Sequence, residues 1–391
     1  MKEHITLRKY TKSNVKRAGK ILSNPERRSN PADFNWAMDV LSWWRYQHEQ
    51  PLEKAYKLLQ KVAAKKQPDS ILAKRLKREE SITKKLSRFP DMMLTNMQDI
   101  GGCRVILSTV KKVDKINREL RKCKEFKDAN GRVKVNDYIT NPKPDGYRGY
   151  HLKGSFPGSE DQSFRIEIQV RTKLQHSWAT ALEIVDLFTG QALKSNDGDK
   201  QWQEFFKLVS QQFAVMEKIS RFDQISNELK FAKYSETIIR DSSALSDCGE
   251  CQRLSKSLDV MNKFNAYANS LVMADKHIKA SRIEGFVLVD VTIDNLDNRK
   301  KGTVRTTIFS EDESAQAENE YIKREKEASE QNKGSLVALV SSTAVGGIKE
   351  AYPNFFADTT LFMQHLVFIN GIQNYKLRDK FIKMLWPFNQ S

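Results

Sequence analysis

The first quarter of the chain has hydrophobic residues spaced three and four positions apart, which is typical of helices that bury one face. Trp36, Val40, Trp43 and Trp44 follow this spacing and predict a buried aromatic stripe on one helix. The predicted helices of this region are a short one capped by Ser13 or Asn14, one that begins after Asn30, Leu52–Ala64, and Ile71–Phe89, which Pro90 ends.

From about residue 98 to residue 172 the hydrophobic spacing changes to every second residue, which is typical of strands with one buried face. Strands are predicted at Cys103–Leu107, Val135–Ile139, His151–Phe156 and Arg165–Val170. Helices are predicted near Lys111–Lys122, at Lys173–Asp186 and at Lys200–Phe222. This order of elements predicts an α+β fold, in which a mixed β-sheet is flanked by helices.

A second region is predicted after residue 225. Polar helical sequence comes first, and Gly285–Asp294 and Gly302–Phe309 then predict a β-hairpin. Further elements are predicted as a charged helix at Glu311–Gln331, a strand at Ser335–Ser341 and a helical tail at Leu361–Leu385. We therefore expect three parts, namely residues 1–225 with the mixed sheet, a helical connector at 226–284 and a smaller C-terminal α/β domain at 285–391.

Composition narrows the class of protein. Of the 391 residues, 39% are hydrophobic and 29% are charged, as in a globular protein. No apolar run approaches the ~20 residues of a membrane-spanning helix, and the N-terminus lacks the apolar core of a signal peptide. We therefore expect a cytoplasmic protein with no membrane partner. Cys248 and Cys251 form a lone CxxC, for which two reduced thiols in a loop fit better than a zinc site that lacks its other ligands.

Positive charge is concentrated at the start of the chain. The net charge of the whole protein is +17, and residues 1–90 hold 22 lysines and arginines against 9 acidic residues. Such a field attracts polyphosphate or nucleic acid. The same charges also fit solvated helix faces that keep a protein dispersed, so both interpretations stay open.

Three polar segments between residues 97 and 172 combine tight turns with fixed charges. Asp99 precedes the Gly101-Gly102 turn, Arg104 follows it on a predicted strand, and Glu167 lies in the middle of another strand. An enzyme that acts on a magnesium-bound nucleoside triphosphate needs carboxylates to bind the magnesium ion and cationic side chains to bind the phosphates. Each acid alone is more often a salt-bridge partner, but together they are a candidate metal pair. Alternation in residues 164–172 places three polar side chains on one face: Glu167, Gln169 and Arg171.

Four motifs over about residues 70–185 resemble, in order and spacing, the synthetase domain of RelA/SpoT proteins. The motifs are Arg75-Leu-Lys77 with Ser81 and Lys85, Asp99–Arg104, Asp137–His151 with its Gly146-Tyr-Arg-Gly149 turn, and Glu167–Thr172 followed by Trp178-Ala179. Enzymes of that family transfer a pyrophosphoryl group from ATP to a ribose 3′-hydroxyl and release AMP. The resemblance therefore implies Mg²⁺ as cofactor and ATP as pyrophosphate donor.

The resemblance also implies a role for each matching residue. Asp99 and Glu167 would bind magnesium, and Glu167 would help to deprotonate the attacking hydroxyl. Tyr147, the third member of the catalytic set, would stack under the acceptor base. The ATP phosphates would be bound by Arg75, Lys77, Lys85 and Arg104, with Ser81 orienting the phosphate loop. The acceptor side would be lined by Lys143, His151 and Arg171. Each residue also has a structural alternative. Tyr147 could be an ordinary aromatic residue of a turn, His151 could be a sheet residue whose hydrogen bonds are satisfied within the protein, and Trp178 could belong to the hydrophobic core.

Departures from the family pattern bear on regulation and substrate. Long members carry a histidine–aspartate hydrolase domain upstream, whereas the first 70 residues here hold only His4 and His48. This implies a synthetase-only form with its own C-terminal domain. Gly149 stands where serine is common in the family, so the acceptor stays open between tRNA and a guanine nucleotide, GDP or GTP.

The segment Ala351–Asp358 resembles the C-terminal part of CapRel proteins, fused toxin–antitoxin members of the family that act in phage defence. Their Tyr-x-x-Tyr element plugs the ATP site. Here Tyr352 matches the first tyrosine and Phe355 replaces the second. The resemblance implies an autoinhibited enzyme whose C-terminal regulatory domain binds a phage protein, such as the major capsid protein. The released enzyme would modify the 3′-CCA end of tRNA and stop translation.

Three alternatives accompany this hypothesis. The same active site could make an alarmone from GDP or GTP, or the chain could be a catalytically inactive regulator that binds nucleotide or RNA. Tyr352 and Phe355 could instead staple a C-terminal helix to its domain. If they form a plug, removing residues from about 340 onward, or changing Tyr352→Ala, increases the toxicity of the expressed protein.

Overall fold

The computed structural model describes residues 10–77, 79–159, 162–189, 193, 198–264, 286–296, 299–310, 313, 316–317, 320–321, 323–324, 327, 335–341 and 359–372. The chain divides into two compact units. The first unit comprises Met1–Thr140 and Gly149–Thr172, and the second comprises Asn141–Arg148 and Lys173–Ser391. The loop 141–148 therefore belongs to the second unit, although both of its neighbours along the chain belong to the first.

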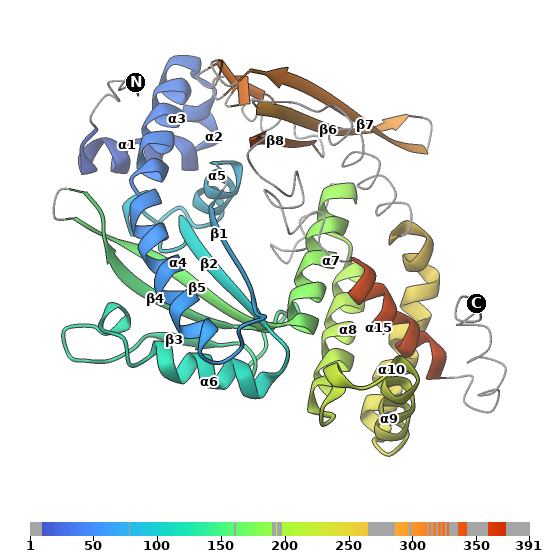
Figure 1. Ribbon diagram of the computed structural model, residues 1–391. Coiled ribbons are helices and arrows are strands. Elements are labelled where there is room, and N and C mark those ends of the chain that lie inside the picture. The colour runs from blue at the N-terminus through green and yellow to red at the C-terminus, as the bar shows by residue number, and fades with distance from the viewer. Residues whose placement is uncertain are drawn as a thin grey trace. The chain divides into compact units, whose positions relative to one another are not determined.

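A five-stranded mixed sheet in the order β1-β2-β5-β4-β3 forms the centre of the first unit (Figure 1). Its strands are β1 (Ile71–Leu76), β2 (Gly101–Leu107), β3 (Val135–Asp137), β4 (Tyr150–Pro157) and β5 (Ser163–Thr172). β2 and β5 run parallel, and the other neighbouring pairs run antiparallel. The mixed sheet and the four strands predicted between residues 98 and 172 are confirmed.

One face of this sheet is apolar and is covered by two helices, α4 (Glu49–Ala64) and α6 (Val110–Leu120) (Figure 1). Leu59 of α4 and Ile116 of α6 pack into the same core as Val105 of β2 and Ile168 of β5, and all four are fully buried. Successive side chains of a strand point to opposite faces. The residues between these apolar positions therefore project from the other face, where the polar side chains gather.

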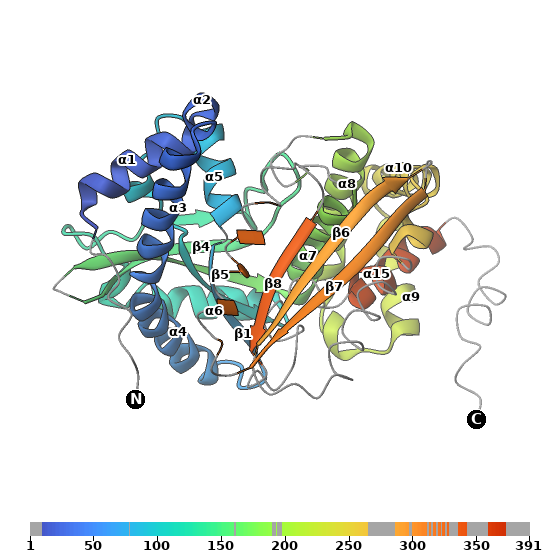
Figure 2. The same ribbon diagram turned by 90° about the horizontal axis from the view of Figure 1, so that it is seen from above.

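The remaining helices of the first unit are α1 (Lys12–Ser23), α2 (Pro25–Arg28), α3 (Pro31–Tyr46) and α5 (Glu79–Arg88), seen together in Figure 2. Val40 and Trp44 are buried in the core that α1, α3 and α5 share, and Trp36 and Trp43 pack against it, which confirms the aromatic stripe. The predicted cap of the first helix was wrong. Thr11 is the N-cap, because its hydroxyl oxygen accepts from the Asn14 amide at 3.2 Å.

The predicted single helix over Ile71–Phe89 was also wrong. Ile71–Leu76 forms strand β1, which pairs antiparallel with β2, and α5 begins only at Glu79. A short run with apolar residues at both ends fits a helical and an extended period equally well. Pairing with β2 decides between them, because it satisfies one edge of each strand.

The second unit has a helical core built from five elements: α7 (Lys173–Thr189), α8 (Lys200–Lys218), α9 (Asn227–Ile239), α10 (Ser242–Ser257) and α15 (Thr359–Gly371). Phe362, Leu366 and Ile369 of α15 are fully buried among side chains of the other four helices. The predicted helical tail is confirmed up to Gly371, and residues 373–385 of that prediction lie outside the described residues.

A three-stranded antiparallel sheet in the order β7-β6-β8 also belongs to the second unit (Figure 2). Its strands are β6 (Phe286–Leu296), β7 (Arg299–Phe309) and β8 (Ser335–Ser341). This confirms the predicted hairpin and the predicted third strand. Short 3₁₀ turns lie at η1 (Leu94–Asn96), η2 (Lys124–Phe126) and η4 (Phe222–Gln224). The assignment of separate functions to residues 1–225, 226–284 and 285–391 stays a prediction.

Candidate active site

The polar face of the five-stranded sheet carries several of the predicted site residues in rows. In the first row, Gly102 of β2 lies between Arg75 of β1 and Glu167 of β5, and Glu167 lies opposite Lys153 of β4. A Cβ atom added to Gly102 would meet only the backbone oxygen of Glu167 within 4 Å, at 3.7 Å. The glycine therefore leaves room beside the carboxylate. The next row on this face consists of Arg104, Gln169 and His151.

Glu167 is the centre of a hydrogen-bonded cluster. Its Oε1 lies 3.1 Å from His151 Nδ1, and its Oε2 accepts from Gln169 Nε2 at 2.7 Å. Gln169 Oε1 in turn accepts from Arg171 Nη2 at 2.8 Å. Burial opposes ionisation of Glu167, but His151, Gln169 and the charge of Lys153 outweigh burial and hold its pKa far below the usual value. Glu167 is therefore a carboxylate at neutral pH.

Asp99 forms a second charged cluster. Its Oδ2 accepts from Lys77 Nζ at 3.0 Å, and its Oδ1 accepts from Lys85 Nζ at 2.8 Å. Lys77 directly follows β1, where its amide donates to Ile100 O at 2.7 Å, and Lys85 lies on α5. Burial of Asp99 disfavours its charge, yet the two lysines prevail and lower its pKa. The structure thus joins three predicted site residues from three separate segments of the chain.

The two carboxylates lie in the same part of the first unit. Asp99 precedes Gly102 by three residues, and Gly102 pairs with Glu167. Three extended residues span at most ~11 Å and neighbouring strands are ~4.8 Å apart, so the two Cα atoms lie at most ~16 Å apart. Two carboxyl side chains with an ion between them span a distance of this order.

This donor set fits magnesium better than a metal bound by protein alone. Among the described residues, no group of three or more histidine, cysteine, aspartate or glutamate side chains is placed to hold a metal ion. Mg²⁺ usually takes one or two protein carboxylates together with water and substrate phosphates. Asp99 and Glu167, both ionised, would hold an ion that binds together with ATP, and the lysines beside Asp99 would then be free to contact phosphates.

The other predicted ATP residues occupy different environments. Arg75 is exposed on β1 in the row of Glu167, and Ser81 is exposed on α5. Arg104 is buried on β2, one row further along the polar face. The structure therefore places Arg75 and Arg104 on the face that carries Glu167 and Ser81 on the helix that carries Lys85. Their roles stay predictions.

The predicted acceptor residues are divided between the two units. His151 and Arg171 belong to the first unit, whereas Lys143 and Tyr147 belong to the loop 141–148 of the second. In that loop, Lys143 Nζ lies 4.9 Å from the centre of the Tyr147 ring, a cation–π geometry. The Tyr147 amide donates to Asp145 Oδ1 at 2.8 Å, which fixes the turn around Gly146.

Several residues at these clusters had no role in the sequence analysis. Tyr138 packs edge-on against His151 with ring centres 5.3 Å apart, and Lys153 adds positive charge beside Glu167. Strand alternation predicts the position of Lys153 once the register is known, but the register itself is not readable from the sequence. In the second unit, Arg148 forms a buried ion pair with Glu217, 69 residues away along the chain.

Three further predictions concern residues away from the sheet. Tyr352 and Phe355 lie outside the described residues, so the plug stays a prediction. Cys248 and Cys251 are buried free thiols on α10, and burial raises the pKa of Cys248 to about 11. The predicted loop was wrong, because both thiols lie on a helix and are buried in the helical core.

Among the helices that the structure describes, none is long and apolar enough to cross a membrane.

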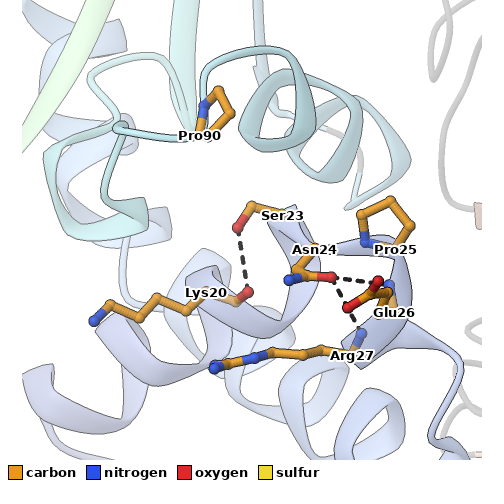
Figure 3. A pocket seen from close by; sticks show the side chains of 7 residues that line it. All are labelled: Lys20, Ser23, Asn24, Pro25, Glu26, Arg27 and Pro90. Atoms are coloured by element: carbon orange, nitrogen blue, oxygen red, sulfur yellow. Dashed lines mark hydrogen bonds between the residues drawn. The ribbon is translucent and has the colours of Figure 1, made fainter.

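A surface depression in the first unit lies beside the junction of α1 and α2 and is bordered by Pro90 (Figure 3). Its polar groups serve as helix caps, since Asn24 Oδ1 accepts from the amides of Glu26 and Arg27 and Ser23 Oγ donates to Lys20 O. None of the predicted site residues lines this depression.

The region that contains most of the predicted site residues matches a known protein family. Residues 74–185 match the family model described as "Region found in RelA / SpoT proteins". The matched range includes β2, β4 and β5, Lys77, Lys85 and Asp99 beside them, and the loop 141–148. This part of the chain is therefore of the RelA/SpoT type.

Two curated proteins of Bacillus subtilis are similar to this chain. GTP pyrophosphokinase YwaC is 33% identical over 114 residues, which are 27% of this chain and 52% of that protein. GTP pyrophosphokinase YjbM is 33% identical over 118 residues, 29% of this chain and 54% of that protein. The chain thus spans about half the length of the curated relatives it matches. A solved structure, the small alarmone synthetase 1 from Bacillus subtilis bound to its product pppGpp, is 24% identical with a TM-score of 0.39 and covers 45% of this chain and 93% of that chain.

Proposed function

We propose that this protein is an ATP-dependent pyrophosphotransferase of the RelA/SpoT type, which moves a pyrophosphoryl group from ATP to a ribose 3′-hydroxyl. The observation that carries the proposal is the pairing of two ionised carboxylates, Asp99 held by Lys77 and Lys85 and Glu167 held by His151, within the RelA/SpoT-type region. When bound, Mg²⁺ would neutralise charge that develops on the phosphates.

The acceptor 3′-oxygen forms a bond to the β-phosphorus of ATP, and the bond from that phosphorus to the oxygen bridging the α-phosphate breaks, so AMP leaves with the electron pair. The hydroxyl proton passes to Glu167. Because the pKa of Glu167 is far below its usual value, this carboxylate is a weak base. It orients the hydroxyl and accepts the proton late, when bond formation has made the oxygen acidic.

The first candidate for the acceptor is the 3′-CCA end of tRNA. The observation that favours it is the net charge of +13 in residues 1–90, part of which lies on exposed side chains of α1 such as Lys12, Lys16 and Lys20. A tRNA offers many phosphates to such a surface, whereas a free nucleotide offers two or three. The second candidate is GDP or GTP, and it is favoured by the names of the two relatives, which are GTP pyrophosphokinases.

A labelled-acceptor experiment tests the activity and separates the acceptors. The protein is incubated with Mg²⁺ and ATP labelled in the γ-phosphate, together with tRNA, GDP or GTP, and the labelled product is identified. Label on tRNA supports the first candidate, and label on the guanosine nucleotide alone excludes it. The Glu167→Gln variant is the matched control for both acceptors and should label neither. If neither acceptor is labelled by the wild type or by a Tyr352→Ala variant, the chain is an inactive regulator and the enzymatic proposal fails.

We further propose that Tyr352 and Phe355 form an aromatic plug that restrains the enzyme until a phage protein, such as the major capsid protein, binds the C-terminal part. An aromatic pair can stack where adenine would bind. Support comes from α15, which begins four residues after Phe355 and is buried in the helical core of the second unit. A segment on the same chain as the site that it blocks binds intramolecularly, so a modest affinity can suffice for inhibition.

A further inference from the structure

The loop 141–148, which carries Lys143 and Tyr147, lies directly against helix α8. Gly146 has a φ of +88°, and its carbonyl oxygen accepts from Ser210 Oγ at 2.5 Å. A Cβ atom added to Gly146 would lie 2.8 Å from the Cα of Lys207. Backbone therefore meets backbone with no space between, and the position of α8 fixes the position of the loop.

A buried ion pair ties the end of the loop to two helices. Arg148 Nη1 lies 2.5 Å from Glu217 Oε2, and the two side chains are only 9% and 5% exposed. The same Glu217 oxygen accepts from Gln175 Nε2 of α7 at 3.3 Å. Because a buried charge without its partner is strongly destabilising, this pair resists separation and holds the loop to both α7 and α8.

A ladder of aromatic rings connects the loop to the C-terminal helix. Tyr147 packs edge-on against Trp178 of α7 at 6.3 Å between ring centres, and Trp178 contacts Phe206 of α8 at 5.8 Å. The ladder continues from Phe206 to Phe362 of α15 at 6.0 Å. Trp178 is fixed in place because its Nε1 donates to Phe206 O at 2.7 Å. Phe362 is fully buried, so this ring of α15 is part of the close-packed core around the ladder.

We propose that Glu217 and Phe362 are positioning residues for Tyr147, and that the C-terminal helix thereby controls affinity for the acceptor rather than for ATP. The meaning given to Tyr147 rests on the proposed function. The affinity for ATP should not depend on α15, because Lys77, Lys85 and Asp99 are held by contacts within the first unit. The two core clusters that support their elements contain residues of the first unit alone.

Hydrogen exchange of the full chain tests the positioning without any need for activity. The amides of Gly146 and Tyr147 are hydrogen-bonded within the loop, to Lys143 O at 2.9 Å and Asp145 Oδ1 at 2.8 Å, and report on its order. Glu217→Gln and Phe362→Leu are each expected to speed exchange in residues 141–148 by about three- to tenfold, the loss of one aromatic or charged contact. Exchange in β2 should stay unchanged.

The matched control is Phe368→Leu, which removes a second buried ring from the same helix but one that contacts Phe231 of α9 rather than the ladder. Loop exchange that is unchanged in Glu217→Gln and Phe362→Leu overturns the proposal. Loop exchange that rises equally in Phe368→Leu also overturns it, since general loosening of the core then explains the effect.

Kinetics provide a second readout once an acceptor is known. In the Tyr352→Ala background, which lacks the proposed plug, Glu217→Gln and Phe362→Leu should raise KM for the acceptor by about three- to tenfold and leave KM for ATP unchanged. An equal rise in both constants contradicts the proposal. If no acceptor is ever labelled, the proposed function fails, whereas the exchange experiment still decides whether α15 positions the loop.

Discussion

Lys85 Nζ lies 2.8 Å from Asp99 Oδ1 and so joins helix α5 to the turn before β2. The side chains of Asp99 and Lys85 are 19% and 29% exposed, and Lys77 occupies the other carboxylate oxygen. Changing Asp99→Asn removes the negative charge between two cations and one of the two candidate magnesium ligands. We expect pyrophosphoryl transfer to fall by at least about 100-fold, as is usual when a group that stabilises developing charge is lost. The exposed Asp91→Asn is the control and should keep full activity.

The same Asp99→Asn variant has a predicted pH signature in stability. The folded state lowers the pKa of Asp99, so this group stabilises the fold above its ordinary pKa of ~4, and that contribution is lost as pH falls through the lowered value. Urea unfolding should therefore show a wild-type advantage of about 1 to 3 kcal/mol at pH 7 that shrinks at pH 3. If the difference in unfolding free energy between wild type and Asp99→Asn stays constant with pH, the charge of Asp99 is not its cause.

Glu167→Gln tests the second carboxylate. Gln169 and His151 both contact Glu167, and the amide has nearly the same shape, so the fold should tolerate the change. We expect transfer to any acceptor to be lost and the thermal midpoint to change by only a few degrees. Glu204→Gln, at a half-exposed glutamate of α8 that pairs with Lys207, serves as control. Residual activity above about one-tenth of wild type would remove Glu167 from the reaction.

Glu79 is predicted to matter for stability and for ATP together. It is fully buried at the start of α5, where it accepts from Ser42 Oγ at 2.5 Å and pairs with Arg45 at 2.8 Å. Glu79→Ala leaves Arg45 without its carboxylate and should cost about 3 to 5 kcal/mol of unfolding free energy. Because α5 also carries Lys85, KM for ATP should rise as well.

The double variant Glu79→Ala with Arg45→Met is the control for this prediction. An apolar pair in place of a buried ion pair is often neutral, so the double variant should recover most of the stability that Glu79→Ala loses. Losses that simply add in a urea double-mutant cycle would show that the two side chains do not act as a pair.

Strand alternation and motif order allowed the polar face of the sheet to be predicted in outline. Glu167, Gln169 and Arg171 follow from period two alone, and they do share one hydrogen-bonded cluster. The helix predicted over Ile71–Phe89 was wrong because six residues cannot distinguish the two periods without knowledge of the partner strand. The Arg148–Glu217 pair and the grouping of the loop 141–148 with the helices depend on contacts between residues far apart in sequence. No local pattern signals such contacts.

Gly146→Ala probes the acceptor loop through its backbone. Alanine at this position would be destabilising for two reasons. Its backbone would have to adopt a φ of +88°, and its Cβ atom would lie 2.8 Å from the Cα of Lys207, a backbone atom that cannot shift without moving α8. We expect a loss of about 2 to 4 kcal/mol in unfolding free energy and a higher KM for the acceptor. Gly131→Ala is a matched control, because Gly131 has a φ of +73° with nothing within 4 Å. It should lose only about 1 to 2 kcal/mol. Equal losses at the two glycines would mean that the loop does not press on α8.

The final prediction separates two ways to remove the proposed plug. Truncation from about residue 340 was expected to raise toxicity, but it also deletes α15, whose Phe362, Leu366 and Ile369 are fully buried. Losing three such side chains costs about 7 to 15 kcal/mol, as much as the roughly 5 to 15 kcal/mol that stabilise a typical domain, so the truncated chain should misfold and lose toxicity. Tyr352→Ala leaves α15 in place and should raise toxicity if the plug exists. Growth assays of both variants, with soluble protein measured in parallel, check this. A folded, more toxic truncation would contradict the role of α15 in the core, and a well-expressed Tyr352→Ala variant with unchanged growth would contradict the plug.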